Sequence, residues 1–158
     1  MISRRHLILA GFATMLPGHV SAAACTSAPD IAGPGPWFNS SPLSLAKLKG
    51  KVVLVEFWTF GCHNCRNVEP YVKQWHERYA SAGLVIIGVH TPEFAHEADA
   101  GRVEHYLAEN HIAHPVVMDN DYAIWRAFKN QYLPSHYFID AQGRIRYHHF
   151  GEGGYGES

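Results

Sequence analysis

Hydrophobic residues fall into short continuous runs that are separated by segments with a helical spacing. Residues 51–58 form an apolar, β-branched run interrupted only by Glu56, and residues 84–89 form a second one. A strand that is buried on both faces of a sheet has this pattern. Residues 116–118 make a shorter third run. The sequence therefore predicts a core of three buried strands.

The segments between these runs predict helices. One begins near Cys62 and ends at Gly83, and its apolar side chains recur every three or four residues, at Val68, Val72, Trp75 and Tyr79. Pro70 lies inside this helix and is expected to kink it. A second helix is expected over 102–110, and a third after the helix-entry residues 119–121. Strands that alternate with helices predict a parallel core with right-handed crossovers.

The pattern changes near the end of the chain. Residues 135–140 and 144–150 are strand-like and are joined by the short segment 141–143, which predicts an antiparallel hairpin. The predicted fold class is therefore α/β, with a central mixed sheet flanked by helices. A chain of 158 residues has room for one such domain.

The first 24 residues are interpreted as a signal peptide. Arg4 and Arg5 precede an apolar stretch that is too short to span a bilayer, and residues 22–24 form a small-residue cleavage region. The paired arginines also resemble a twin-arginine signal. An uncleaved membrane anchor and a lipidated Cys25 are the alternatives, and a periplasmic or other extracytoplasmic location is expected in each case. Residues 25–41 are rich in proline and glycine and are expected to lead into a domain over 42–158.

Composition narrows the class of partner. The formal net charge is −1, and lysine and arginine form no run longer than one pair, so nucleic acid is not an expected partner. Most of the twelve histidines are interpreted as surface residues. We expect a monomer.

The candidate chemistry lies at Cys62 and Cys65. Two cysteines separated by two residues at the start of a helix bring their sulfurs within bonding distance. Free amides of the helix N-terminus stabilise a thiolate at Cys62, and a protonated His63 adds to this effect. Cys62 is predicted to attack a substrate disulfide and Cys65 to resolve the mixed disulfide. A zinc site is disfavoured, because a tetrahedral site needs two more ligands and the chain has no second such pair.

A carboxyl group in the central strand is the candidate proton acceptor. Glu56 is costly to bury without a partner or a task, and it lies six residues before Cys62. It is predicted to accept the proton of Cys65 at the resolving step. An ion pair between Glu56 and a nearby cation such as Lys51 is the alternative.

His63 and four further residues are candidates for substrate binding. A cis peptide at Leu133–Pro134 offers the backbone of Leu133 to an extended substrate, although most bonds of this type are trans. Trp58 and Phe60 are candidates for an apolar platform beside the cysteines, with a place in the core as the alternative for Trp58.

Residues 53–66, with Pro70 behind them, resemble the active-site segment of the thioredoxin superfamily in its extracytoplasmic TlpA/ResA-type branch. Other segments most resemble the thioredoxin-like domain of DipZ-type proteins, namely residues 87–93, 119–120, 133–140 and 151–153. The resemblance implies a thioredoxin-like fold in which the Cys62–Cys65 disulfide is the redox centre, without metal or other cofactor. It also implies that Pro134 is the cis-proline and that Glu56 is the buried acid.

Two departures from this family add expectations. The helix that normally follows the last strand is expected to be absent. DipZ-type proteins carry a membrane electron-transfer domain that this sequence lacks, so a separate membrane thiol carrier is expected to supply electrons. Protein thiols and disulfides are the expected substrates.

Two other functions stay open as alternatives. Thr59 and Cys62 match the end of a peroxiredoxin site, which favours a thiol peroxidase, although Val55 replaces the proline of that site. Thioredoxin-fold copper metallochaperones use two cysteines and a distant histidine, here His90 or His136, but they space their cysteines by three residues. Reduction of substrate disulfides is the expected direction, because residues 62–150 leave no room for the helical insertion of DsbA-type oxidants.

Overall fold

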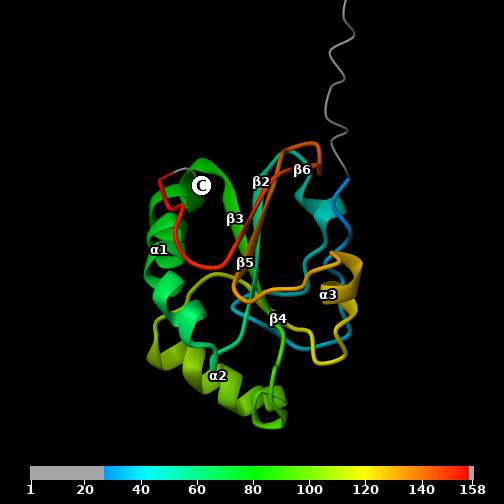
Figure 1. Cartoon of the computed structure of the whole chain (residues 1–158). Helices are drawn as coiled ribbons and strands as arrows, with labels where there is room; N and C mark the ends of the chain where they lie inside the picture. Colours follow the sequence, from blue (N-terminus) through cyan, green and yellow to red (C-terminus); the bar gives the residue numbers. More distant parts are fainter. Residues whose placement is uncertain (1–26, 157–158) are drawn as a thin grey trace, which may run out of the picture.

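The computed structural model describes residues 27–156, which form a single sheet flanked by helices (Figure 1). Within this range the sheet has six strands in the order β1-β4-β3-β2-β5-β6. Their bounds are Trp37–Phe38 (β1), Val52–Trp58 (β2), Leu84–His90 (β3), Val116–Met118 (β4), Ser135–Ile139 (β5) and Ile145–Phe150 (β6). Strands β2, β3 and β4 run parallel, whereas β1, β5 and β6 pair antiparallel with their neighbours. The mixed sheet and the hairpin predicted from the sequence are both present.

Helices cover both faces of the sheet. Helices α1 (His63–Tyr79) and α2 (Ala100–Glu109) lie on one face, and the short α3 (Ala123–Ala127) lies on the other (Figure 1). Three short 3₁₀ helices complete the structure, namely η1 (Leu45–Leu48), η2 (Ala80–Ala82) and η3 (Ala95–Ala98). Helix α1 begins one residue after Cys62, as predicted.

The alternation of side chains along β2 builds two cores. Val53, Val55 and Phe57 are buried on the face of α3, where Phe57 makes edge contacts with Trp125 and Phe128. The side chains between them point to the opposite face, because successive residues of a strand alternate. There Leu54 packs under α1. The central strand is therefore buried on both faces, and this explains why its sequence is continuously apolar.

The proline- and glycine-rich segment is more closely integrated than the sequence suggested. Residues 25–41 were expected to lead into a domain beginning at 42, yet Ile31 is fully buried in the core and β1 pairs with β4 at the edge of the sheet. A glycine is required at position 35, because a Cβ atom there would overlap the backbone of Met118. The described part of this segment therefore belongs to the domain.

The third helix is shorter than its apolar pattern suggested. It spans only Ala123–Ala127, and Tyr122 before it has a left-handed backbone with a φ of 58°. The Asp119 carboxylate caps this turn by accepting hydrogen bonds from the backbone of Ile124 (2.9 Å) and Trp125 (2.8 Å). Burial raises the pKa of Asp119, and these hydrogen bonds work in the opposite direction. Asp119 therefore has the predicted helix-entry role.

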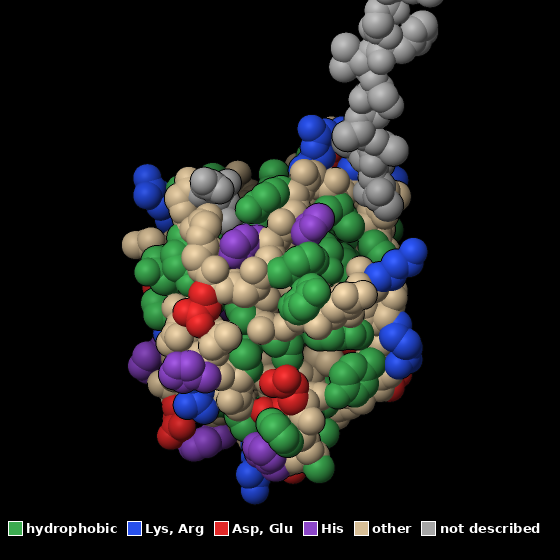
Figure 2. Space-filling model, in the orientation of Figure 1, with side chains coloured by type: hydrophobic (Ala, Val, Ile, Leu, Met, Phe, Trp, Pro, Cys, Tyr) green, Lys and Arg blue, Asp and Glu red, His purple; other side chains and the backbone are tan. Residues whose placement is uncertain are grey.

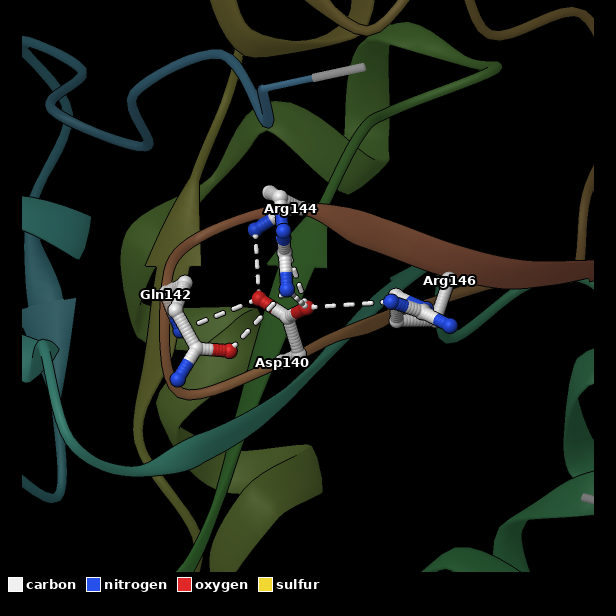
Figure 3. A network of polar contacts seen from close by, with 4 residues as sticks. All are labelled: Asp140, Gln142, Arg144 and Arg146. Atoms are coloured by element: carbon white, nitrogen blue, oxygen red, sulfur yellow. Dashed lines mark hydrogen bonds and ion pairs between the residues drawn. The ribbon is translucent and has the colours of Figure 1, made fainter. Parts of the chain in front are cut away.

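The hairpin turn between β5 and β6 is held by one carboxylate (Figure 3). Asp140 Oδ1 accepts hydrogen bonds from the backbone of Gln142 and Arg144, and Oδ2 lies 2.9 Å from the Arg144 guanidinium and 3.6 Å from that of Arg146. Gly143 has a φ of 79°, which favours glycine at this point of the turn. The turn also anchors the beginning of the described chain, because Ala28 N–H donates to Gly143 O.

The segment after β6 lies against α1, without a helix in the described residues 151–156 (Figure 1). Tyr155 stacks on Tyr71 of α1 with ring centroids 3.7 Å apart, and it packs against the cluster formed by Leu54 and Val68. As expected, no closing helix follows β6 within the described residues, and Tyr155 covers part of the sheet face that carries α1. The signal peptide predicted for residues 1–24 and Cys25 lie outside the described residues. Between 27 and 156, no helix has the length and apolarity needed to cross a membrane.

Candidate active site

The two cysteines lie where β2 passes into α1. Cys62 is the N-cap residue of α1, and its sulfur accepts a hydrogen bond from the backbone of Cys65 (3.2 Å). The pair forms a disulfide with the Cα atoms 5.3 Å apart. Cys65 is 3% exposed, whereas Cys62 is only half-buried. A substrate can therefore reach Cys62 more easily, which fits the predicted order of attack and resolution.

The second side of the site comes from the start of β5. The Leu133–Pro134 peptide bond is cis, as predicted. Because β5 is antiparallel to β2, with Ser135 opposite Phe57, the beginning of β5 lies beside the end of β2. Leu133 packs against the cluster that also contains both cysteines. The pairing of these two strands places the cis-proline next to the redox pair.

Glu56 lies beneath α1 and faces a histidine. It is 5% exposed, and its Oε1 lies 3.6 Å from Nε2 of His136, its cross-strand partner on β5. The group that faces Glu56 is therefore His136, and no lysine among the described residues forms an ion pair with it. Glu56 stands on the same face of β2 as Leu54 and Trp58, which pack against α1 and Cys65 respectively. Glu56 therefore lies on the side of the sheet on which Cys65 packs.

Two nitrogen groups lie over Gly88 on the neighbouring strand. Gly88 is opposite Glu56 on β3, and a Cβ atom there would lie 2.7 Å from Trp58 Nε1 and 3.4 Å from His114 Nε2. Burial lowers the pKa of His114 to about 4, although Glu56 works in the opposite direction. His114 is therefore neutral at neutral pH. His114 has no signal in the sequence, because a lone histidine before a short strand matches no recognisable motif.

Of the two aromatic residues before Cys62, Trp58 lies in the core and Phe60 stays partly exposed. Trp58 is 5% exposed and lies in the core with Cys65, so it is not a surface platform. Phe60 is half-buried between the rings of His90 and Tyr106, at centroid distances of 5.5 and 5.8 Å. The Arg66 side chain fixes the loop further by donating to Phe60 O (2.9 Å). Phe60 therefore keeps a partly open aromatic surface beside the cysteines, and His63 is exposed at the start of α1.

The His90 side chain contacts the loop between β2 and Cys62 from the protein interior. It is fully buried at the end of β3, where its Nε2 lies 3.1 Å from Thr59 Oγ1 and accepts a hydrogen bond from Phe60 N–H (3.3 Å). Burial lowers the pKa of His90 to about 4, although the Glu97 carboxylate works in the opposite direction. A neutral imidazole with Nε2 as acceptor carries its proton on Nδ1.

These contacts bear on both alternative functions. The hydroxyl of Thr59, the threonine of the peroxidase-like pattern, lies 3.1 Å from His90 Nε2. His136, the other histidine considered for copper, faces Glu56. Across residues 27–156, no group of three His, Cys, Asp or Glu side chains is arranged to hold a metal ion.

Residues 25–148 match the family model described as AhpC/TSA family. The chain belongs to this family. It is 44% identical over 134 residues to the protein DipZ of Mycobacterium tuberculosis, an alignment that covers 83% of this chain and 19% of DipZ. It is 32% identical over 128 residues to the thiol-disulfide oxidoreductase YkuV of Bacillus subtilis, covering 81% of this chain and 84% of that one.

Solved structures agree with this assignment. A thioredoxin-like protein solved in solution in its oxidised form superposes with a TM-score of 0.75 at 31% identity, covering 82% of this chain and 86% of that protein. The thioredoxin-like fold predicted from the sequence is confirmed, and the domain is of the thiol–disulfide oxidoreductase type with Cys62 and Cys65 as its Cys-x-x-Cys pair. The chain spans about a fifth of the length of the DipZ proteins that it matches.

Proposed function

We propose that this AhpC/TSA-family domain is an extracytoplasmic reductase of protein disulfides. The observation that carries the proposal is the Cys62–Cys65 disulfide at the N-terminus of α1, with Leu133 packed beside it just before the paired strand β5. Amide groups at a helix N-terminus stabilise a thiolate, and a nearby second cysteine can displace a bound substrate. The relative YkuV is named a thiol-disulfide oxidoreductase.

The proposed reaction has two exchange steps. The Cys62 thiolate attacks one sulfur of a substrate disulfide, so that a mixed disulfide forms and the first substrate sulfur leaves as a thiolate. Cys65 then loses its proton to Glu56 and attacks the Cys62 sulfur, which releases the second substrate thiolate. The substrate gains two electrons, and the domain is left with its disulfide. A separate membrane thiol carrier returns two electrons to the pair.

The surface beside the site suits a polypeptide substrate. Tyr132 precedes the cis-proline loop and is 54% exposed, and its ring lies 5.1 Å from that of Phe150, which is 40% exposed. Gly151 N–H donates to Pro134 O and thereby joins the end of β6 to this loop. Figure 2 shows hydrophobic side chains across this face, with lysine and arginine mainly at its rim. Such a surface favours an unfolded or extended protein segment over a small charged thiol.

The reduction potential tests the direction of the reaction. Reduced and oxidised glutathione buffers are equilibrated with the purified domain, and its free thiols are then counted. We expect a potential nearer to the thioredoxin value of about −270 mV than to the DsbA value of about −120 mV. A value above about −150 mV would assign the domain to the oxidases.

The location is tested on the mature protein. We expect export with cleavage between Ala23 and Thr26, because the run of small residues ends there. Fractionation of expressing cells followed by N-terminal sequencing of the exported form measures both. Recovery of the chain in the cytoplasm with Met1 intact would contradict the extracytoplasmic assignment.

A further inference from the structure

A fully buried carboxyl group lies under the loop that carries Cys62 and takes no part in the steps above. Glu97 belongs to η3 and has no exposed surface. Its Oε2 atom accepts hydrogen bonds from the backbone N–H groups of Glu93 (2.6 Å) and Phe94 (3.0 Å). Its Oε1 atom accepts none from the described residues. Oε2 therefore holds η3 in place through hydrogen bonds, whereas the charge on Oε1 is not offset by a hydrogen bond from the described residues.

The free oxygen faces the residue before the nucleophile. A Cβ atom built on Gly61 would overlap Glu97 Oε1, so only glycine leaves room for the carboxyl group at this position. Gly61 is bonded directly to Cys62. The unpaired oxygen of Glu97 therefore lies within one residue of the backbone that carries the nucleophilic sulfur.

No cation among residues 27–156 forms an ion pair with Glu97. The basic group behind the same loop is His90, which is neutral near pH 7 because burial lowers its pKa to about 4. The remaining basic groups near the loop are His63 and Arg66 at the start of α1 and His96 on η3, and all three are exposed. Water and salt screen exposed charges far more than a buried one.

The two redox states differ in how they respond to this carboxylate. The oxidised pair is a neutral disulfide, whereas the reduced pair carries a thiolate on Cys62. A buried negative charge raises the free energy of that thiolate and leaves the disulfide unaffected. It therefore opposes the helix N-terminus, His63 and Arg66, which favour the thiolate, and it makes the reduced pair a stronger electron donor.

We propose that Glu97 sets the reduction potential of the Cys62–Cys65 pair by disfavouring the Cys62 thiolate through its unpaired oxygen beneath Gly61. The proposal rests on the proposed function, and it identifies the group that keeps a pair at a helix N-terminus reducing. Glu97 acts through the field at Cys62 and touches no reacting atom, so it is a positioning residue and not a catalytic one.

The test compares Glu97→Gln with the wild-type domain in glutathione buffers. Glutamine keeps the shape and removes the charge. We expect the equilibrium to move toward the dithiol by about fivefold to fiftyfold, where a tenfold change corresponds to about 30 mV. We also expect the pH profile of Cys62 alkylation in the reduced protein to move to lower pH by the same factor. Glu104→Gln, at an exposed position on α2, is the control and should change neither quantity by more than about twofold.

Two more variants separate charge from structure. Glu97→Asp keeps the charge but shortens the side chain, and Glu97→Leu removes the charge without burying an amide. If the charge of Glu97 sets the potential, the Gln and Leu variants should shift the thiol–disulfide equilibrium by similar factors. The Asp variant should shift it less. The proposal would be overturned if all three variants shifted the thiol–disulfide equilibrium by the same factor. It would also be overturned if a folded neutral variant, Glu97→Gln or Glu97→Leu, left the equilibrium unchanged. The effect is a difference between variants, so it can be read even if the wild-type potential itself contradicts the reductase direction.

Discussion

Replacing Cys62 by serine reduces insulin-disulfide reduction to the uncatalysed rate. The Cys62 thiolate forms the first bond to the substrate, and a serine hydroxyl does not take part in thiol–disulfide exchange. The matched variant Cys65→Ser keeps the attacking sulfur and removes the resolving one. It should therefore accumulate mixed disulfides with substrate proteins, which non-reducing gels followed by mass spectrometry detect.

The two variants must behave differently for the assigned order to hold. Cys62 is half-buried and Cys65 is 3% exposed, so only the first sulfur is readily open to a polypeptide. Equal trapping by Cys62→Ser and Cys65→Ser would show that either sulfur can attack. The partners trapped on Cys65→Ser would also identify the physiological substrates.

Replacing Glu56 by glutamine slows the resolving step by about a hundredfold near neutral pH, a typical effect of losing a positioned proton acceptor. The substitution keeps the shape of a side chain that is 5% exposed and removes its ability to take the Cys65 proton. The measurement is the release of thionitrobenzoate from a mixed disulfide on Cys62, followed across pH. The deficit should shrink at alkaline pH, where hydroxide removes the thiol proton directly.

A control variant separates this effect from a general loss of charge. Glu109 lies on the exposed surface of α2, where it pairs with His105, so Glu109→Gln should leave the resolving rate unchanged. An unchanged rate in Glu56→Gln would instead return Glu56 to a structural role beside His136, in which the two side chains hold β2 and β5 together.

The strands and the redox pair could be predicted from the sequence, because apolar runs and the spacing of two cysteines are visible within a few neighbouring residues. Val116–Met118 and the start of α1 are where the apolar pattern placed them. The strand β1 could not be predicted in this way, because two residues inside a proline-rich segment show no periodicity. Strand β1 forms because its backbone pairs with the edge strand β4. This pairing depends on the assembled sheet and not on the local sequence.

In the site too, single residues could be predicted from local sequence, but their partners depend on tertiary contacts. Glu56 stood out as a charge inside an apolar strand, but its partner His136 depends on how β5 pairs with β2. Glu97 gave no sequence signal, because an acidic residue in a polar loop is normally exposed. Its burial follows from the packing of η3 under the loop at Gly61. Tertiary contacts therefore decide which of the fourteen acidic residues matter.

The pairing of β2 with β5 has a consequence for the insertions and deletions that the chain tolerates. A slip of one residue between these strands would turn His136 away from Glu56 and bring Tyr137 under α1 in its place, so two opposite cores would be disrupted together. A length change between Pro134 and Ile139 therefore damages both the site and the fold. The turn held by Asp140, at the far end of the hairpin, is where an added residue leaves the Glu56–His136 match intact.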